Sequence, residues 1–245
     1  MRKVVLITGG TSDIGKACIN LFFENGYDIS FSYFKNESEA KKISDKLRNN
    51  KCKVLSTKAD FNCENDVKRL FENTIKHFGR IDCLINNAAL ELDNLIENKT
   101  KQDFLDILNV NLIAPFLLSR LVGDYMYKNK SGNIINISST NGIDTYYKYS
   151  LDYDASKSAL ISLTHNLSEN YCPYVRVNSV APGWVNTKTS LKIDDNFKKQ
   201  EEDKIYVKRF ANPKEIANVI YFLASDKASY INNEVIRVDG GTRHL

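Results

Sequence analysis

The chain has 245 residues, of which 42% are hydrophobic and 26% are charged, a composition typical of a soluble globular domain. Its formal net charge of +4 is small and spread along the chain, so it does not indicate a nucleic-acid-binding protein. Five scattered cysteines lack Cys-x-x-Cys spacing, which argues against a disulfide framework and against a zinc site. No stretch approaches the roughly 20 apolar residues that span a bilayer. We therefore expect one cytoplasmic domain over residues 1–245, without a membrane span or a metal.

The N-terminal half alternates predicted strands with predicted helices. Apolar, β-branched runs at 3–8, 27–33, 53–58 and 81–85 predict four buried strands. Helical periodicity at 16–25, 38–49 and 64–78 predicts the helices between them, and Gly79 is placed to end the third. This alternation favours a doubly wound parallel sheet, whose ligands bind at the carboxyl ends of its strands.

The C-terminal half continues the same pattern. Helical stretches at 101–126, 153–170 and 213–224 precede strands at 133–137, 176–180 and 235–238. We therefore expect a single α/β domain with a Rossmann-like sheet of about seven strands and helices on both faces. A polar segment, 188–204, precedes the last helix, and we interpret it as a mobile lid over the binding edge.

A glycine-rich turn, Thr8 to Gly15, links the first predicted strand to a helix. Such a turn is either a tight connection or a phosphate site, where free backbone N–H groups meet the positive end of a helix dipole. The second strand ends in Phe34-Lys35-Asn36, without an acidic residue to bind a free ribose 2′-hydroxyl. Lys35 would instead pair with a 2′-phosphate, which favours NADP, although a solvated lysine explains the same residue.

Polar residues also follow the third, fourth and fifth predicted strands. Asp60 either caps the helix that begins near Glu64 or lies beside an adenine. Asn86-Asn87-Ala88-Ala89 combines two amides with two small residues, which would let a flat ligand approach the backbone. Ser138-Ser139-Thr140 reaches the same edge of the sheet, and the aromatic loop 144–149 that follows would line a substrate pocket.

Tyr153 and Lys157 open the helix at 153–170, and their i, i+4 spacing places them on one face. A free tyrosine has a pKa near 10 and is a poor base, but a nearby positive charge lowers that pKa. Such a pair would exchange a proton with a carbonyl or alcohol oxygen. The pair alone is weak evidence, because Tyr-x-x-x-Lys also occurs on solvated helix faces.

Together these motifs resemble the short-chain dehydrogenase/reductase family over essentially the whole chain. The motifs occur in the family's order: Thr8 to Gly15, Asp60, Asn86-Asn87-Ala88, Asn111, Ser139 with Tyr153 and Lys157, and Pro182-Gly183 with Thr187. The resemblance implies hydride transfer between the nicotinamide and a carbonyl carbon, with Tyr153 moving the proton. It also implies that Ser139 binds the substrate oxygen, that Lys157 tunes Tyr153, and that Asn111 holds a water of a proton relay.

The same resemblance implies the cofactor contacts, with NADP(H) favoured and NAD(H) the alternative. The pyrophosphate would lie on the turn residues Gly9, Thr11, Ser12, Asp13, Ile14 and Gly15. Adenine would lie beside Asp60 and Phe61, and the ribose near the nicotinamide would be bordered by Asn87 and Ala88. The remaining contacts with the nicotinamide and its ribose would come from Tyr153, Lys157, Pro182, Gly183, Val185 and Thr187. Asp13 departs from the family pattern, since it replaces a glycine and adds a negative charge near the pyrophosphate.

Within the family the chain is similar to 3-oxoacyl-(acyl-carrier protein) reductases, through Asp93-Asn94-Leu95 and the segment 223–241. Sugar and polyol dehydrogenases share these features, and the polar lid and aromatic loop suit a hydroxylated substrate. Lys128 and Lys130 are candidate contacts for an acidic carrier protein. Family members are commonly homotetramers, so we expect a homotetramer or a homodimer that pairs through the apolar faces of 104–121 and 159–167.

Two alternatives come from other functional classes. A non-catalytic dinucleotide-binding regulator would use the same fold, but the intact set of Ser139, Tyr153 and Lys157 argues against it. A serine hydrolase on an α/β sheet would need a Gly-x-Ser-x-Gly turn, which the sequence lacks.

Overall fold

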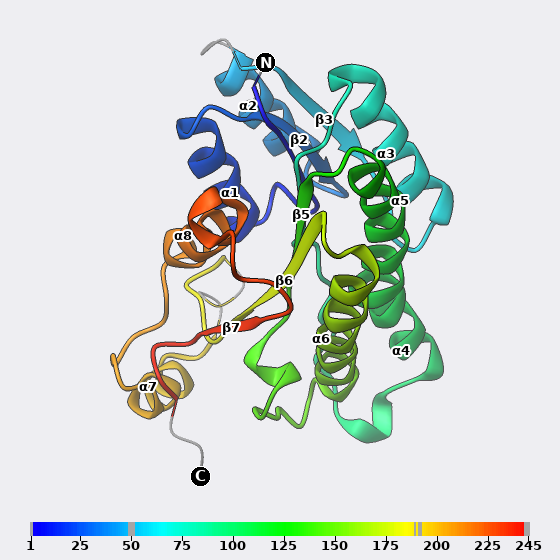
Figure 1. The fold of residues 1–245 in the computed structure, drawn as a ribbon. Coiled ribbons are helices and arrows are strands. Elements are labelled where there is room, and N and C mark those ends of the chain that lie inside the picture. Colours follow the sequence, from blue (N-terminus) through cyan, green and yellow to red (C-terminus); the bar gives the residue numbers. More distant parts are fainter. Residues whose placement is uncertain (1, 49–51, 189, 191–192, 243–245) are drawn as a thin grey trace.

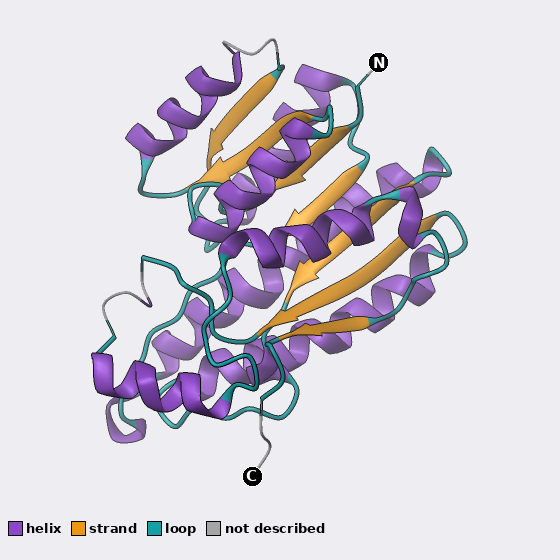
Figure 2. Cartoon of the chain, turned by 90° about the vertical axis from the view of Figure 1, so that its left-hand side faces the viewer, coloured by secondary structure: helices purple, strands orange, loops and turns teal. Residues whose placement is uncertain are grey.

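The computed structural model describes residues 2–48, 52–188, 190 and 193–242. Within these ranges the chain forms one seven-stranded sheet in the order β3-β2-β1-β4-β5-β6-β7. Every pair of neighbouring strands is parallel, and all the arrows in Figure 2 point the same way. The strands are β1 (Val4–Ile7), β2 (Asp28–Tyr33), β3 (Val54–Lys58), β4 (Cys83–Asn86), β5 (Gly132–Ile137), β6 (Val175–Pro182) and β7 (Val235–Val238). The predicted doubly wound parallel sheet is confirmed.

Helices cover both faces of this sheet (Figure 1). One face carries α1 (Asp13–Glu24), α2 (Glu37–Arg48) and α8 (Pro213–Ala224), and the other carries α3 (Glu64–Phe78), α5 (Ala114–Lys128) and α6 (Leu151–Tyr171), with α4 (Lys101–Leu108) beside α6. An apolar cluster fills each layer, around Phe22 and Phe31 on the first face and around Leu84 and Leu118 on the second. Central strands such as β1 and β4 are buried on both faces, which explains why their sequences are continuously apolar.

The end of α3 follows the sequence prediction, whereas its start does not. Gly79 closes the helix in the left-handed conformation, with a φ of 75°. The residue before the first turn is Cys63, and its side chain makes no capping bond. The Asp60 carboxylate instead accepts a hydrogen bond from the Asn62 backbone N–H at 3.0 Å. The interpretation of Asp60 as a helix cap is therefore wrong, because this aspartate forms a local turn with the residue two positions on.

The apolar stretch predicted as one helix at 101–126 is interrupted in its middle. Residues Asn109–Ile113 form a π-helical turn between α4 and α5, and α5 continues to Lys128. Such turns are rare in proteins, and those that do occur often lie at functional sites. By length and composition Lys101–Lys128 is also apolar enough to cross a membrane, contrary to our expectation, although a core helix of a soluble protein meets the same criteria. Here α5 packs against α3 and the sheet.

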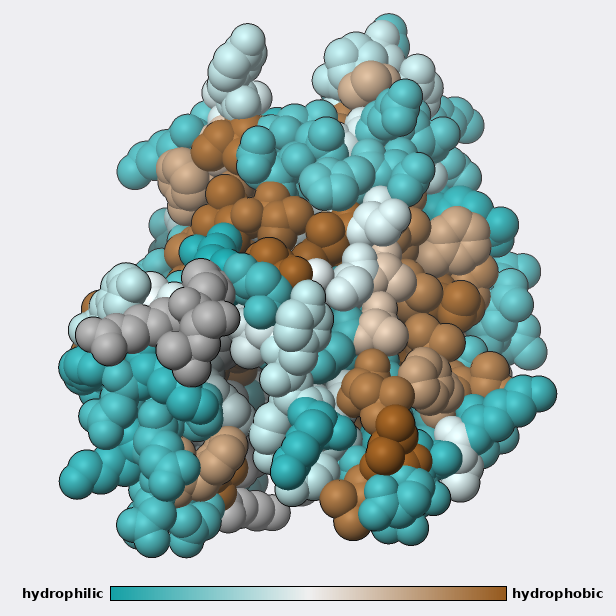
Figure 3. Space-filling view, turned by 90° about the horizontal axis from the view of Figure 1, so that it is seen from below, coloured by the Kyte–Doolittle hydropathy of each residue, from teal (hydrophilic) through white to brown (hydrophobic). Residues whose placement is uncertain are grey.

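Loops and short elements surround the carboxyl edge of the sheet, at the bottom of Figure 1. They include the start of α6, α7 (Asp195–Lys204) and the 3-10 turn Thr140–Gly142 after β5. Figure 3 views this edge from below, and apolar residues gather across its middle and on the side of α4 and α5. The strand ends and helix starts that carry the predicted motifs all meet at this edge.

Candidate active site

The glycine-rich turn is packed too closely to accept side chains at two positions. Gly9 has a φ of +66°, which favours glycine, and a Cβ on Gly15 would lie 2.4 Å from the Gly9 carbonyl oxygen. Ser12 accepts a hydrogen bond from the Gly15 N–H at 3.1 Å, so α1 begins at Asp13. The start of a helix thus faces the carboxyl edge, and Thr11, Ser12, Asp13 and Ile14 have accessible surface around it. This geometry fits a pyrophosphate.

Asp13 occupies the first helical position and has two partners. Its carboxylate pairs with the Lys16 Nζ at 2.9 Å and accepts a hydrogen bond from the Lys188 backbone N–H at 2.7 Å. Partial burial acts to raise the pKa of Asp13, but these two contacts outweigh it and hold that pKa below its ordinary value. The negative charge in the turn is therefore compensated by Lys16, and Asp13 ties α1 to the start of the 188–204 segment.

Asn87 and Thr8 join the end of β4 to the glycine-rich turn. The Asn87 Nδ2 donates to the Thr8 carbonyl at 2.8 Å and lies 3.2 Å from the Gly9 carbonyl and from the Ser12 hydroxyl. The Thr8 hydroxyl accepts hydrogen bonds from the backbone N–H groups of Asn87 and Ala88, each at 2.9 Å. Two strand ends that are far apart in sequence thereby form one rigid junction.

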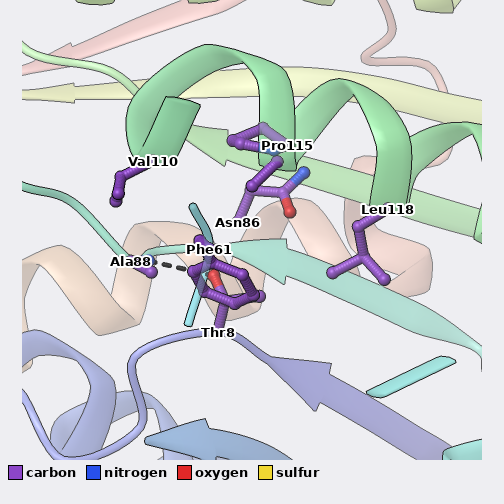
Figure 4. A pocket seen from close by; sticks show the side chains of 8 residues that line it. Thr8, Phe61, Asn86, Ala88, Val110, Pro115 and Leu118 are labelled. Atoms are coloured by element: carbon purple, nitrogen blue, oxygen red, sulfur yellow. Dashed lines mark hydrogen bonds between the residues drawn. The ribbon is translucent and has the colours of Figure 1, made fainter. Parts of the chain in front are cut away.

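A narrow crevice lies between this junction and the π-helical turn (Figure 4). Phe61, predicted to lie beside the adenine, and Ala88, predicted to border the ribose near the nicotinamide, line it together. Val110 lines it too, and our sequence analysis did not single this residue out. Asp60 precedes Phe61, and its backbone N–H donates to the Asp66 carboxylate at 2.9 Å. The other residues that line the crevice are Thr8, Asn86, Ala114, Pro115 and Leu118.

Lys35 lies just beyond the end of β2 and is exposed. Its Nζ is 5.5 Å from the centre of the Phe34 ring. The end of β2 is bound to the glycine-rich turn, since the Ser32 hydroxyl accepts a hydrogen bond from the Gly9 N–H at 3.1 Å. Lys35 therefore stands at the same edge as the turn, where a ribose phosphate would lie.

Tyr153 and Lys157 lie side by side at the start of α6. Lys157 is 2% exposed, and its Nζ donates to the Ile137 carbonyl at 2.8 Å and lies 5.3 Å from the centre of the Tyr153 ring. Burial lowers the pKa of Lys157 to about 8, while the Glu91 carboxylate acts in the opposite direction.

Burial raises the pKa of the Tyr153 phenol, and the charge of Glu91 adds to the increase. A hydrogen bond with the Ser139 side chain acts against it. In the protein alone, desolvation of the phenol therefore sets the net direction of the Tyr153 pKa. That Lys157 lowers this pKa stays a prediction. A phenol that stays protonated at neutral pH is suited to give a proton to a carbonyl oxygen.

The two serines after β5 have different surroundings. Ser138 is 3% exposed, and its hydroxyl donates to the Val180 carbonyl at 3.1 Å and accepts a hydrogen bond from Ser179 at 2.8 Å. Ser139 is only partly buried and lies beside the phenol of Tyr153. Of the two, Ser139 is the one in a position to meet a substrate.

Asn111 is fully buried at the π-helical turn, where it fixes the chain that follows β4. Its Oδ1 accepts a hydrogen bond from the Leu90 N–H at 2.7 Å, and its Nδ2 donates to the Leu90 carbonyl at 2.9 Å and to the Ser156 hydroxyl at 3.0 Å. Ser156 donates in turn to the Tyr153 carbonyl at 2.7 Å. Both side-chain hydrogens of Asn111 are committed to protein, so its side chain holds Leu90 against α6 and has no hydrogen left for the relay water.

Asp152, just before Tyr153, forms a buried ion pair. Its side chain is 0% exposed, and its carboxylate oxygens lie 2.7 and 2.8 Å from the Nζ of Lys99, which is 4% exposed. The same ammonium also donates to the Leu92 carbonyl. This pair holds the segment after β4 against the start of α6, and the sequence gives no local signal for partners so far apart in the chain.

Asp154, just after Tyr153, holds a different loop. Its carboxylate accepts hydrogen bonds from the Asn141 Nδ2 at 2.7 Å and from the Tyr147 N–H at 3.0 Å. The loop that carries Ser139 and the predicted aromatic loop are therefore both attached to the first turn of α6. Our sequence analysis singled out neither of these two acidic neighbours of Tyr153.

The segment after β6 reaches the same edge. Pro182 ends the strand, a Cβ on Gly183 would lie 2.7 Å from the Asp239 Cβ, and Val185 pairs with Ala211. The Thr187 hydroxyl accepts a hydrogen bond from the Ser190 N–H at 3.2 Å. The predicted nicotinamide contacts are thus held in place by backbone pairing and close packing.

Aromatic rings connect α7 to the edge. The Trp184 ring stacks on Phe210 with centres 5.2 Å apart, and Phe197 of α7 lies 6.1 Å from Trp184 and 6.3 Å from Tyr147. The predicted lid, 188–204, thus contains a helix, α7, that packs on the aromatic loop 144–149. Residues 189 and 191–192 of this segment lie outside the described residues, and its role as a lid stays a prediction.

Comparison with known proteins identifies the family of this chain. The family model described as enoyl-(acyl carrier protein) reductase matches residues 9–243. The 3-oxoacyl-(acyl-carrier-protein) reductase FabG of Thermotoga maritima is 34% identical over 246 residues, covering 98% of this chain and 97% of that protein. The chain belongs to the short-chain dehydrogenase/reductase family.

Solved structures of other short-chain dehydrogenases agree with this assignment. A double mutant of a Serratia marcescens short-chain dehydrogenase/reductase has a TM-score of 0.91 at 29% identity, covering 98% of this chain and 97% of that one. Acetoin dehydrogenase YohF from Salmonella typhimurium has a TM-score of 0.89 at 29% identity, covering 99% and 96%. As a member of a family that uses nicotinamide cofactors, this short-chain dehydrogenase/reductase is an oxidoreductase that acts on carbonyl and alcohol groups.

Proposed function

We propose that the protein reduces a ketone to a secondary alcohol, or catalyses the reverse reaction, with NADP(H) as cofactor. The observation that carries this proposal is the placement of Tyr153, Lys157 and Ser139 at the edge where the glycine-rich turn and the end of β6 also lie. These residues fit a nicotinamide dinucleotide. The cofactor, when bound, supplies the hydride, and the chain supplies binding, orientation and the proton.

Three side chains have different roles in the reaction at the substrate oxygen. Ser139 donates a hydrogen bond to that oxygen and holds it beside Tyr153. As the carbonyl oxygen gains negative charge, Tyr153 gives it the phenolic proton, and the raised pKa of the phenol ensures that this proton is present at neutral pH. The ammonium of Lys157, held by the Ile137 carbonyl, then stabilises the phenolate that remains.

The preference for NADP(H) rests on Lys35 and is tested by reversing its charge. Lys35→Glu is expected to lower kcat/KM for NADPH by about tenfold or more, because a contact with a phosphate is charge-assisted, and to change the value for NADH much less. Lys41→Glu, on the exposed surface of α2, is the matched control and should change neither. An equal loss with both cofactors at position 35 would contradict the proposal.

The first substrate class to test is a 3-oxoacyl thioester on acyl-carrier protein, because relatives are named for that reaction. Lys128 and Lys130, at the end of α5, are the candidate contacts for such an acidic partner. The second class is a small hydroxylated ketone, which the carboxylates and aromatic rings around Tyr153 favour. The test is oxidation of NADPH by the purified protein with a panel of both classes. Bound cofactor without turnover of any substrate would favour the regulator.

We also propose a cytoplasmic homotetramer or homodimer. Leu105, Ile113 and Phe116 are exposed apolar residues along α4, the π-helical turn and α5, and a second copy would cover them. All five cysteines are free thiols, which suits a reducing compartment. Light scattering of the purified protein tests the assembly, and a monomer at working concentration would refute it.

A further inference from the structure

The segment that follows β4 is fixed beside Tyr153 at closely spaced points. Asn111 binds both the N–H and the carbonyl of Leu90, and Lys99 binds the carbonyl of Leu92. The Asn94 N–H donates further along to the Tyr149 carbonyl at 2.9 Å. Glu91 therefore lies between two anchored residues, and its backbone has little freedom to move away from the site.

Glu91 differs from the other carboxylates around Tyr153. The carboxylates of Asp152 and Asp154 are hydrogen-bonded to Lys99 and Asn141. The side chain of Glu91 is accessible to solvent, and among the described residues none donates a hydrogen bond to its carboxylate. Its neighbours Leu90 and Leu92 are tied to α6 on either side of Tyr153, the first through Asn111 to Ser156 and the second through Lys99 to Asp152. Glu91 is thereby held near Tyr153 and Lys157, and its charge acts on both.

The surroundings of Glu91 disfavour its charge. Although its side chain is exposed, partial desolvation by the surrounding protein raises the pKa of Glu91 to about 7. Asp93 adds to the increase, Lys157 opposes it, and Asp154 and Asp152 add smaller increases. A partly desolvated carboxylate without a hydrogen-bond donor is stabilised strongly when a bound ligand donates a hydrogen bond to it. The charges of Asp93, Glu201 and Glu91 contribute to raising the pKa of Tyr147. The centre of its ring lies 6.3 Å from that of Phe197. Acceptor oxygens and aromatic rings are therefore neighbours beside the start of α6.

We propose that Glu91 determines substrate specificity, by accepting a hydrogen bond from a hydroxyl or ammonium group that the substrate carries next to its reacting carbon. This inference rests on the proposed function, and it names the substrate as a vicinal hydroxy or amino compound. A hydroxyl and an ammonium group share the required chemistry, since both donate to a carboxylate.

The test compares three secondary alcohols on one carbon skeleton: a vicinal diol, a vicinal amino alcohol and the plain alcohol. Each is oxidised with NADP⁺ by the wild type and by Glu91→Leu. The wild type is expected to prefer the diol or the amino alcohol, and Glu91→Leu is expected to lower kcat/KM for that compound by about 10- to 100-fold, the usual range for a hydrogen bond to a charged group. The plain alcohol should show a much smaller change in kcat/KM, because only the effect of the Glu91 charge on Tyr153 and Lys157 is lost there.

Two further variants complete the test. Glu97→Leu removes an exposed carboxylate from the same segment and should leave the preference unchanged. Glu91→Gln keeps an acceptor oxygen without the charge, so it should retain most activity towards a diol and lose it towards an amino alcohol. With an amino alcohol, kcat/KM of the wild type should also rise with pH as Glu91 ionises, while the diol should respond less.

The outcomes separate this inference from the proposed function. If the wild type turns over alcohols or ketones but shows no preference for a neighbouring donor, or if Glu91→Leu slows all three alcohols equally, the inference is wrong and the proposed function stands. Reduction of a 3-oxoacyl thioester in preference to all vicinal compounds would overturn it in the same way. If no carbonyl or alcohol compound reacts, the proposed function itself fails.

Discussion

The two sides of the carboxyl edge are built by different means. On the cofactor side, glycines, backbone groups and two short side chains, Thr8 and Asn87, join the end of β1 to the end of β4. On the substrate side, long charged side chains bridge distant segments, as in the pairs Lys99–Asp152 and Arg237–Asp144. The cofactor side therefore leaves a recognisable motif in the sequence. The substrate side depends on residue pairs whose members are far apart in the sequence. The cofactor side is thus the easier to predict, and the substrate side is where specificity can change.

The largest expected effect comes from the residue that serves both sides, Tyr153. Tyr153→Phe removes the proton donor, and positioned acids contribute about 100- to 10,000-fold to a rate. We expect kcat to fall within that range while NADPH binds with nearly unchanged Kd, as measured by turnover and by titration of the cofactor. Tyr146→Phe, in the neighbouring loop and 80% exposed, is the control and should retain full activity.

Lys99→Met tests the substrate side. It leaves the buried carboxylate of Asp152 unpaired, and breaking a buried pair in this way costs about 3–5 kcal/mol. We expect the free energy of unfolding in urea to fall by that amount and the KM for the substrate to rise. The double variant Lys99→Met/Asp152→Asn should recover much of the stability, because no buried charge remains. A double variant as unstable as the single one would show that the ion pair is not the cause.

Gly15→Ala tests the cofactor side. A Cβ there meets the Gly9 carbonyl oxygen and the Gly10 Cα at 2.4 and 2.9 Å, so the turn must shift. We expect a loss of about 1–3 kcal/mol in stability together with weaker NADPH binding, measured by urea unfolding and cofactor titration. Gly26→Ala is the matched control, since its φ is +81° and nothing lies within 4 Å of the added Cβ. It should cost about 1 kcal/mol and leave the Kd for NADPH unchanged.

The smallest effect is a change in how stability depends on pH. The pKa of Glu91 is raised to about 7 in the folded protein from an ordinary value of 4.5. Between those values the folded state binds more protons than the unfolded state, so stability falls as pH rises through this window and is level above it. Glu91→Gln should flatten this fall, which thermal unfolding of both proteins at pH 5 and pH 8 measures. Parallel pH profiles would show that the carboxyl has an ordinary pKa.

The sequence predicts well those features that depend on neighbouring residues. The apolar runs mark the strands, Gly79 ends α3, and the glycine-rich turn precedes α1, because each depends on local backbone geometry. The helix-cap interpretation of Asp60 failed because the same side chain serves a local turn and a helix start equally well. Its place beside the adenine stays a prediction. The π-helical turn at Asn111 escaped prediction, since helical periodicity alone does not register a single wide turn.

The candidate site shows the same limit. The residue types at 139, 153 and 157 follow from their motif, but the direction of the pKa of Tyr153 depends on how deeply the fold buries the phenol. The roles of Asp152 and Asp154 depend on Lys99 and Asn141, which only the folded chain brings to them. Burial and long-range pairing are properties of the three-dimensional arrangement, and a linear pattern does not contain them.

The bond between Asp13 and the Lys188 backbone joins the proposed dinucleotide site to the proposed lid. One end belongs to the start of α1, and the other belongs to the stretch that continues towards α7 and its aromatic neighbours. A displacement of the Asp13 carboxylate or of the Lys188 backbone should therefore shift its partner as well. A change of this aspartate to asparagine or glycine should be detectable at a distance, as altered substrate affinity, even though the residue touches no substrate.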